Sequence, residues 1–219
     1  MSIRGWAARP ISTNPADYED VPAASRASDL SRASSISERD LDWLEQAIRL
    51  GKPGIRHFAS VAMARHAPKR AIQLFEELGF EAFSEATINL GPEGIPYVLK
   101  RVEDGKPHPY YPVLLTLLIE NNPDSPEAKT AVPALLRWLL DPTPEVKAFA
   151  LRALGAFQAP EALMLPHAAA ADPILRRGAV RGLGALPKRS AMVEEALTAA
   201  TKDRDKNVSA EAKEALRKP

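Results

Sequence analysis

The stretch DPTPEVKAFALRALG, residues 141–155, decides the fold of this 219-residue chain. Its Asp and two prolines form a break, and after the break apolar residues recur at the spacing of one helix face. Three further stretches carry the same pattern: IRHFASVAMAR from Ile55, LRRGAVRGLGAL from Leu175 and VSAEAKEALRK from Val208. Self-similarity of this kind indicates a repeated helical unit.

Each of the four stretches has the same distribution of large and small side chains. Counted from the first residue as zero, positions zero and eight are predominantly large and apolar, whereas positions four and seven are small. We expect the large residues to fill the core and the small ones to let a neighbouring helix approach closely. Position zero holds Ile55, Val146, Leu175 and Val208, and position four holds Ala59, Ala150, Ala179 and Ala212. Position seven holds Ala62, Ala153, Gly182 and Ala215, and position eight holds Met63, Leu154, Leu183 and Leu216.

A second pattern precedes the repeats. Residues 95–99, 132–136 and 165–169 each open with an apolar residue followed by proline. A proline inside a helix removes a backbone hydrogen bond, so this pattern predicts a bend in each of these helices. Since no segment shows the period-two alternation of a strand, the predicted fold class is all-α.

The phrase at 141–155 resembles the HEAT repeat, in particular the short HEAT-like type of the phycobilisome lyases, and the opening at Val132 resembles that family's first helix. The resemblance is strong over residues 128–217 and weaker over 37–121. It implies a right-handed α-α superhelix, a HEAT-like solenoid of about six helical hairpins. It also implies a structural ladder between turn acids and basic residues: Asp141, Asp172 and Asp203 with Arg56, Lys147 and Arg176.

The first 36 residues differ from the rest, because they are rich in Ser, Ala and Pro and have no sustained apolar period. They are either a flexible tail or a segment that docks through anchors such as Trp6, Ile11, Tyr18 and Leu30. Ser37 and Asp40 have the spacing of a helix N-terminal capping box. The predicted repeat domain therefore covers residues 37–219.

Composition limits the chemistry. The 29 basic residues nearly balance the 28 acidic ones, which argues against a nucleic-acid binder, and there are no cysteines. The four histidines lack the spacing of a helical zinc site, and no phosphate-binding loop or serine-nucleophile motif is present. We therefore expect no cofactor, no metal and no catalysis. The absence of a signal-peptide pattern and of a membrane-length apolar run predicts a cytoplasmic protein.

HEAT-like solenoids present a concave face formed by the second helix of each unit. In the C-terminal half its candidate residues are Lys147, Arg152, Arg176, Arg177 and Arg181. Two interpretations stay open: a solvated face that pairs with the turn acids, or a basic groove for an acidic segment of another protein.

The leading functional expectation is a non-catalytic protein–protein interaction module, such as an adaptor, a scaffold or an immunity-type partner. One alternative is an enzyme on the same scaffold, either lyase-like or DNA-base glycosylase-like. Trp138 and Asp141 are the residues that most resemble the aromatic residue and acid that such glycosylases use. Another is a nucleic-acid-binding module without catalysis.

Overall fold

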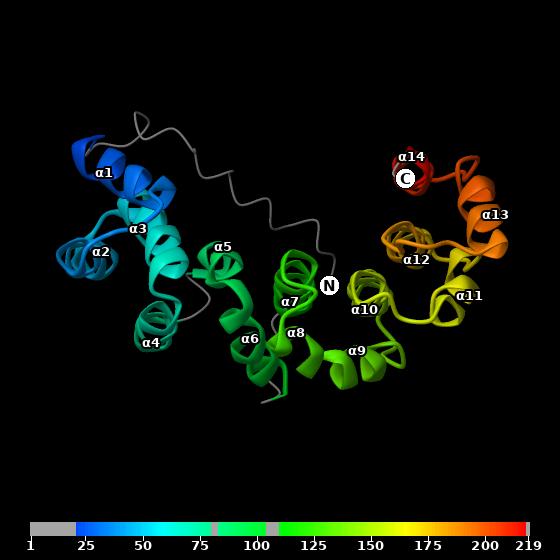
Figure 1. Ribbon diagram of the computed structural model, residues 1–219, viewed down its shortest axis with the longest axis horizontal. Coiled ribbons are helices and arrows are strands. Elements are labelled where there is room, and N and C mark those ends of the chain that lie inside the picture. The colour runs from blue at the N-terminus through cyan, green and yellow to red at the C-terminus, as the bar shows by residue number, and fades with distance from the viewer. Residues whose placement is uncertain (1–20, 80–82, 104–109, 218–219) are drawn as a thin grey trace. The chain divides into compact units, whose positions relative to one another are not determined.

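The computed structural model of the protein describes residues 21–79, 83–103 and 110–217 (Figure 1). Every regular element in these ranges is a helix, as the sequence predicts. The helices form two compact units, which divide between Gly91 and Pro92. None of these helices is long and apolar enough to cross a membrane.

The first unit is built around α3, Pro53–His66, which is buried on most of its circumference. α3 contacts four other helices of this unit. Ile55, Phe58 and Met63 fill its core, together with Leu44 of α2 and Phe75 of α4. The surrounding helices are α1, Val21–Arg32; α2, Glu38–Leu50; α4, Pro68–Leu78; and α5, Ser84–Thr87.

α1 lies inside the segment for which the sequence left a flexible tail and a docked segment both open. It packs along α3 with Ala24, Ala27 and Ser28 buried. α3 also holds the C-terminal end of α1, because its last two residues, Arg65 and His66, donate hydrogen bonds to carbonyl oxygens of α1. Residues 21–32 are therefore a helix that packs against α3 within the first unit.

The predicted tail anchors are placed only in part. Trp6, Ile11 and Tyr18 lie outside the described residues, and Leu30 of α1 is half-buried. The predicted start of the next helix is confirmed. The Ser37 side chain accepts from the Asp40 N–H, and the Asp40 carboxylate accepts from the Ser37 N–H, which is a complete capping box.

The second unit has two layers (Figure 1). The long-helix layer runs in the order α7, α10, α12, α14, in which each helix packs against the next. Its members are α7, Tyr110–Asn121; α10, Pro144–Ala156; α12, Pro173–Gly184; and α14, Lys206–Arg217. The short-helix layer on the other side consists of α6, Gly94–Glu103; α8, Pro126–Thr130; α9, Val132–Trp138; α11, Leu165–Ala168; and α13, Ala191–Ala200. The 3-10 helix η4, Ile88–Glu93, crosses the division between the units, and a second one, η5, Glu161–Leu163, precedes α11.

One apolar core connects α10, α12, α13 and α14. Leu151, Leu183 and Val208 are among its fully buried members. Positions four, seven and eight of the predicted pattern are buried in all four stretches, except that Leu216 is half-buried. At position zero Ile55 and Val208 are buried, whereas Val146 and Leu175 are only half-buried. The pattern therefore locates the core correctly, with its weakest points at the first residue.

The glycines of α10 and α12 serve close packing, as expected. A Cβ on Gly182 would lie 2.4 Å from the carbonyl oxygen of Leu151, and one on Gly178 would lie 2.6 Å from the Cα of Ala148. Neither distance is possible for a real side chain, because the clashing atoms belong to the backbone of the facing helix. These glycines lie inside α12 and let α10 and α12 approach closely. They are therefore not part of a phosphate-binding loop.

The apolar-proline openings lie where the helical path is interrupted. Pro133 and Pro166 occupy the first turns of α9 and α11, and Pro96 is the third residue of α6. A single residue in the right-handed helical region joins each of the first two helices to the segment before it, namely Ala131 between α8 and α9 and Met164 between η5 and α11. Each of these two prolines therefore begins a short helix directly after another helical segment, where its missing N–H interrupts no hydrogen bond of the new helix.

Candidate functional site

The long-helix layer of the second unit carries a groove of about 700 Å³. Residues of α7, α10, α12 and α14 line it, and so does the loop after α12. Its charged lining residues are Arg152, Arg181, Arg189, Glu120, Glu211 and Glu214. Three guanidinium groups thus face three carboxylates, so the groove has mixed charge; of the two interpretations left open by the sequence, arginines paired with acids describe it better than a purely basic groove.

Arg152 and Arg181 line this groove, and Arg177 lines an adjoining hollow together with both of them. Arg152 of α10 donates two hydrogen bonds to Glu120 of α7, at 3.2 and 2.8 Å. Arg177 of α12 donates to Glu211 of α14 at 2.8 Å. Arg181 lies between these pairs, with its nitrogens 3.8 Å from Glu120 and 3.6 Å from Glu211. The three arginines therefore share two carboxylates.

Lys147 and Arg176 face elsewhere, although the sequence grouped them with these arginines. Arg176 is almost fully buried, with 7% of its side chain exposed. Burial, and then the positive charge of Lys147, lower the pKa of His167 of α11. At 3.6 residues per turn, Lys147 and Arg152 are about 140° apart around the helix, and so are Arg176 and Arg181. The predicted set therefore splits into two faces, and Arg176 is removed from the candidate binding surface.

Arg176 instead pairs with Asp203, a turn acid of the ladder that the resemblance implies, through hydrogen bonds between the two side chains. It donates to both carboxylate oxygens of Asp203, at 2.7 and 2.8 Å, and to the carbonyl oxygens of Ala170 and Ala171. The hydrogen bonds from Arg176 hold the pKa of Asp203 below its ordinary value. The structural role implied by the HEAT-like resemblance fits this pair.

The turn acids have a further common role. Asp141, Asp172 and Asp203 each accept from the backbone N–H two residues ahead, which closes the turn before the next helix. Trp138, which together with Asp141 suggested a glycosylase-like site, is buried. Its indole ring is therefore not exposed for stacking on a base.

A smaller hollow adjoins the groove between α10 and α12. Its volume is about 160 Å³, and Phe149, Ala148, Ile174 and Gly178 form its apolar part. Arg152, Arg177, Arg181 and Glu145 line its polar part. The guanidinium of Arg152 lies 5.9 Å from the centroid of the Phe149 ring, a cation–π distance. We call this feature the Phe149 hollow; it shares Arg152 and Arg181 with the groove.

No protein-family model matches this chain, and no curated protein matches it.

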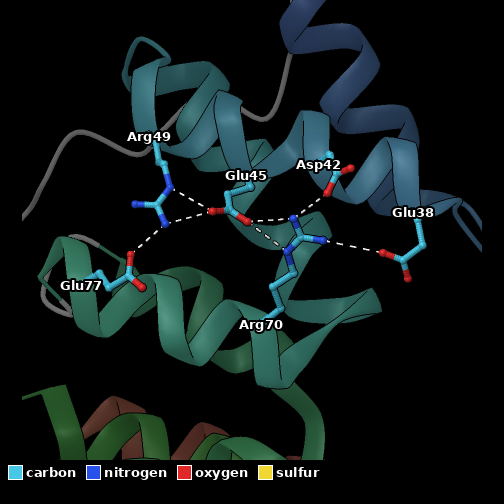
Figure 2. Close-up of polar contacts among 6 residues, drawn as sticks. All are labelled: Glu38, Asp42, Glu45, Arg49, Arg70 and Glu77. Carbon is cyan, nitrogen blue, oxygen red and sulfur yellow. Dashed lines mark hydrogen bonds and ion pairs between the residues drawn. The ribbon is translucent and has the colours of Figure 1, made fainter.

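The first unit carries a different charged cluster, which joins α2 to α4 (Figure 2). Arg70 of α4 donates to Glu45 at 2.8 Å and to Asp42 at 2.7 Å, and Arg49 of α2 donates to Glu77 of α4 at 2.7 Å. Hydrogen bonds from Arg70 and then Arg49 lower the pKa of Glu45. The cluster clamps two helices that flank α3, and its ion pairs explain its geometry without a ligand.

Sequence reasoning missed the carboxylates of the groove and the aromatic floor of the hollow. A signal for the carboxylates was present, because the bonded partners lie about one repeat apart: 32 residues from Glu120 to Arg152 and 34 from Arg177 to Glu211. For Phe149 there was no such signal, since its repeat position is not part of the apolar pattern.

Among the residues described, no three His, Asp or Glu side chains are grouped so that they could hold a metal ion.

Proposed function

We propose that this chain is a HEAT-like repeat protein that binds another protein, without catalysis, through the long-helix layer of its second unit. In this proposal α9–α10, α11–α12 and α13–α14 are successive hairpins of a right-handed solenoid. The long helices are the second helices of these hairpins, and they form the binding face.

The repeat assignment is supported by features that recur one unit apart. The small residues at positions four and seven lie at helix contacts, and the three turn acids close equivalent turns. Ion pairs join α7 to α10 and α12 to α14, and the Arg176–Asp203 pair joins α12 to the turn before α14. Side chains that bond only to the neighbouring unit are typical of repeat proteins.

The observation that carries the proposal is the groove of about 700 Å³ on this layer, with its arginines. Arginine is enriched at protein interfaces because its planar fork donates two parallel hydrogen bonds to a carboxylate and its flat face stacks on apolar groups. Arg177 and Arg181 remain 50% and 43% exposed, so a partner can reach both.

The mixed charge of the groove favours a protein over a nucleic acid. Glu120, Glu211 and Glu214 line the same surface as the arginines. A phosphate backbone would meet these carboxylates at close range, whereas a protein surface can place a cation opposite each of them.

The test is affinity capture with the tagged full chain, compared between wild type and the double variant Arg177→Glu/Arg181→Glu. The matched control is Lys202→Glu/Lys213→Glu, which reverses two exposed charges that do not line the groove. We expect wild type and control to retain one stoichiometric protein and the double variant to lose it, with an unchanged helical circular dichroism signal.

Other outcomes of this capture would refute the proposal. Recovery of nucleic acid in place of a protein, or of a bound chromophore, would indicate another class of function. Retention of the protein by the double variant would show that the partner binds elsewhere on the chain.

A further inference from the structure

Arg181 has a hydrogen-bonding capacity that its neighbours do not use. Both nearby carboxylates already accept hydrogen bonds from other arginines, Glu120 from Arg152 and Glu211 from Arg177. The distances from Arg181 to these carboxylates, 3.8 and 3.6 Å, exceed a hydrogen bond. Two carboxylates therefore hold three guanidinium groups in place, and Arg181 is oriented without being saturated.

The Phe149 hollow lies beside this guanidinium and has the size of a single side chain. Its volume is about 160 Å³, and a cavity of about 150 Å³ with apolar walls accommodates a benzene ring. Phe149 and Ile174 supply apolar surface that is only partly covered, with Ile174 40% exposed. An apolar side chain that entered the hollow would cover this surface.

The unused donors of Arg181 select the charge of the ligand. Arg152, Arg177 and Arg181 line the hollow together with Glu145. Arg152 and Arg177 are already bonded to Glu120 and Glu211, so the guanidinium that a ligand can bind without displacing a hydrogen bond is that of Arg181. A carboxylate next to the inserted side chain would take the free donors of Arg181, or compete with Glu211 for Arg177. The planar guanidinium group can donate two parallel hydrogen bonds to one carboxylate. Such a charged pair is the strongest polar contact that a ligand could form at Arg181.

We propose that the Phe149 hollow binds a short segment of another protein in which an apolar side chain lies next to an Asp or Glu. The apolar side chain occupies the hollow between α10 and α12, and the carboxylate binds Arg181. This inference rests on the proposed function and specifies the chemistry of the partner.

The experiment uses the full chain and a phage-displayed library of random heptapeptides, followed by fluorescence anisotropy with the enriched peptides as synthetic probes. We expect enriched sequences to carry Leu, Ile, Met or Phe within three positions of an acid. Two variants test the two halves of the site: Arg181→Glu removes the cation, and Ile174→Glu places a charge in the apolar wall. Each should weaken peptide binding by at least about tenfold, equivalent to about 1.4 kcal/mol.

The variants are chosen so that the fold survives. Ile174 is the second residue of α12, where an acid is favourable to the helix dipole, and Arg181 is exposed. Lys202→Glu is the control with the same charge change as Arg181→Glu at an exposed position outside the hollow, and it should bind the peptides like wild type. Circular dichroism and thermal unfolding confirm the fold of each variant.

Three results would overturn the inference: enrichment of basic or purely polar peptides, equal binding by both variants and wild type, or no enrichment at all. These results are distinguishable from a failure of the proposed function. If the chain still captures a stoichiometric protein that Arg177→Glu/Arg181→Glu releases, the proposed function stands and only the short-segment chemistry is wrong. If no protein is captured either, both are wrong.

Discussion

Replacing Arg176 by methionine tests the buried contact between α12 and the turn before α14. The substitution keeps most of the aliphatic volume and removes the guanidinium. Four hydrogen bonds are lost: two to Asp203, at 2.7 and 2.8 Å, and two to the carbonyl oxygens of Ala170 and Ala171, at 2.9 and 2.8 Å. The pair is largely shielded from solvent, with 7% of Arg176 and 11% of Asp203 exposed.

The expected loss follows from these contacts. A hydrogen bond to a charged group contributes about 1.5 to 3 kcal/mol, so four of them give a gross loss of at least about 6 kcal/mol. Water can hydrogen-bond to the carboxylate and carbonyl groups that lose Arg176, which reduces the net loss of stability. Asp203 also still accepts a hydrogen bond from the Asp205 N–H. Removal of one partner of a buried ion pair costs about 3 to 5 kcal/mol. We expect about 3 kcal/mol, because this pair is near the surface, and a fall in Tm of about 6 to 12 °C.

The assay is urea unfolding followed by circular dichroism for wild type, Arg176→Met, Asp203→Asn and the double variant. The coupling energy between the two positions should be about 1.5 to 2 kcal/mol. Hydrogen exchange should show the loss of protection in α12 and α14 and leave the first unit unchanged. A loss below about 0.5 kcal/mol, which is the size of an ordinary surface change, or additive single variants, would refute the reasoning.

The same pair predicts a pH dependence. Hydrogen bonds from Arg176 lower the pKa of Asp203 below its ordinary 3.8. A group whose pKa is lower in the folded state stabilises the fold above its unfolded pKa, and this contribution is lost as pH falls through the folded pKa. The difference in stability between wild type and Arg176→Met should therefore be full at neutral pH and shrink as the pH is lowered below about 3.8.

Three further outcomes are expected. Gly182→Ala should destabilise the second unit by about 2 kcal/mol, since a clash with the facing backbone costs about 3 kcal/mol and helix propensity returns about 1 kcal/mol; unchanged urea unfolding would contradict the close-packing role. Arg70→Met should cost about 1 kcal/mol in the first unit and less at high salt, because its ion pairs are partly exposed; a salt-independent loss would instead indicate packing. Lys147→Gln should raise the pKa of His167, measured by NMR titration, because burial and then the ammonium of Lys147 lower that pKa in the wild type. An unchanged pKa would show that the charge of Lys147 does not act on His167.

Interactions between residues close in sequence were easier to predict than those between residues far apart in sequence. The capping box at Ser37 involves neighbours within three residues, so the sequence predicts it directly. The turn positions of Asp141 and Asp172 were implied by the family resemblance, and their bonds to the N–H two residues ahead came from the structure. The small residue at Gly182 also followed from sequence, because the repeat pattern marks the face that meets the next helix. The apolar-proline pattern indicated a change in the helix at Pro133 and Pro166, but it did not show that a new short helix begins there.

The candidate site was predictable only in part. The structure brings Arg152, Arg177 and Arg181 together. Lys147 and Arg176 were grouped with them as residues beside the apolar stripe, although a displacement of five residues turns the side chain by about 140°. Glu120 and Glu211 were missed, and they give the groove its mixed charge.

By itself the sequence determined that the chain is helical, that a helix begins after Ser37, and which face of each repeated stretch is apolar. These properties depend on local hydrogen bonding and on the period of the helix, both of which are written in consecutive residues. Only the tertiary structure decided which arginines are saturated, which are buried and which remain available, and that α1 belongs to the packed first unit. Those properties depend on partners 27 to 34 residues away, whose distance is set by helix packing and not by the chain's order.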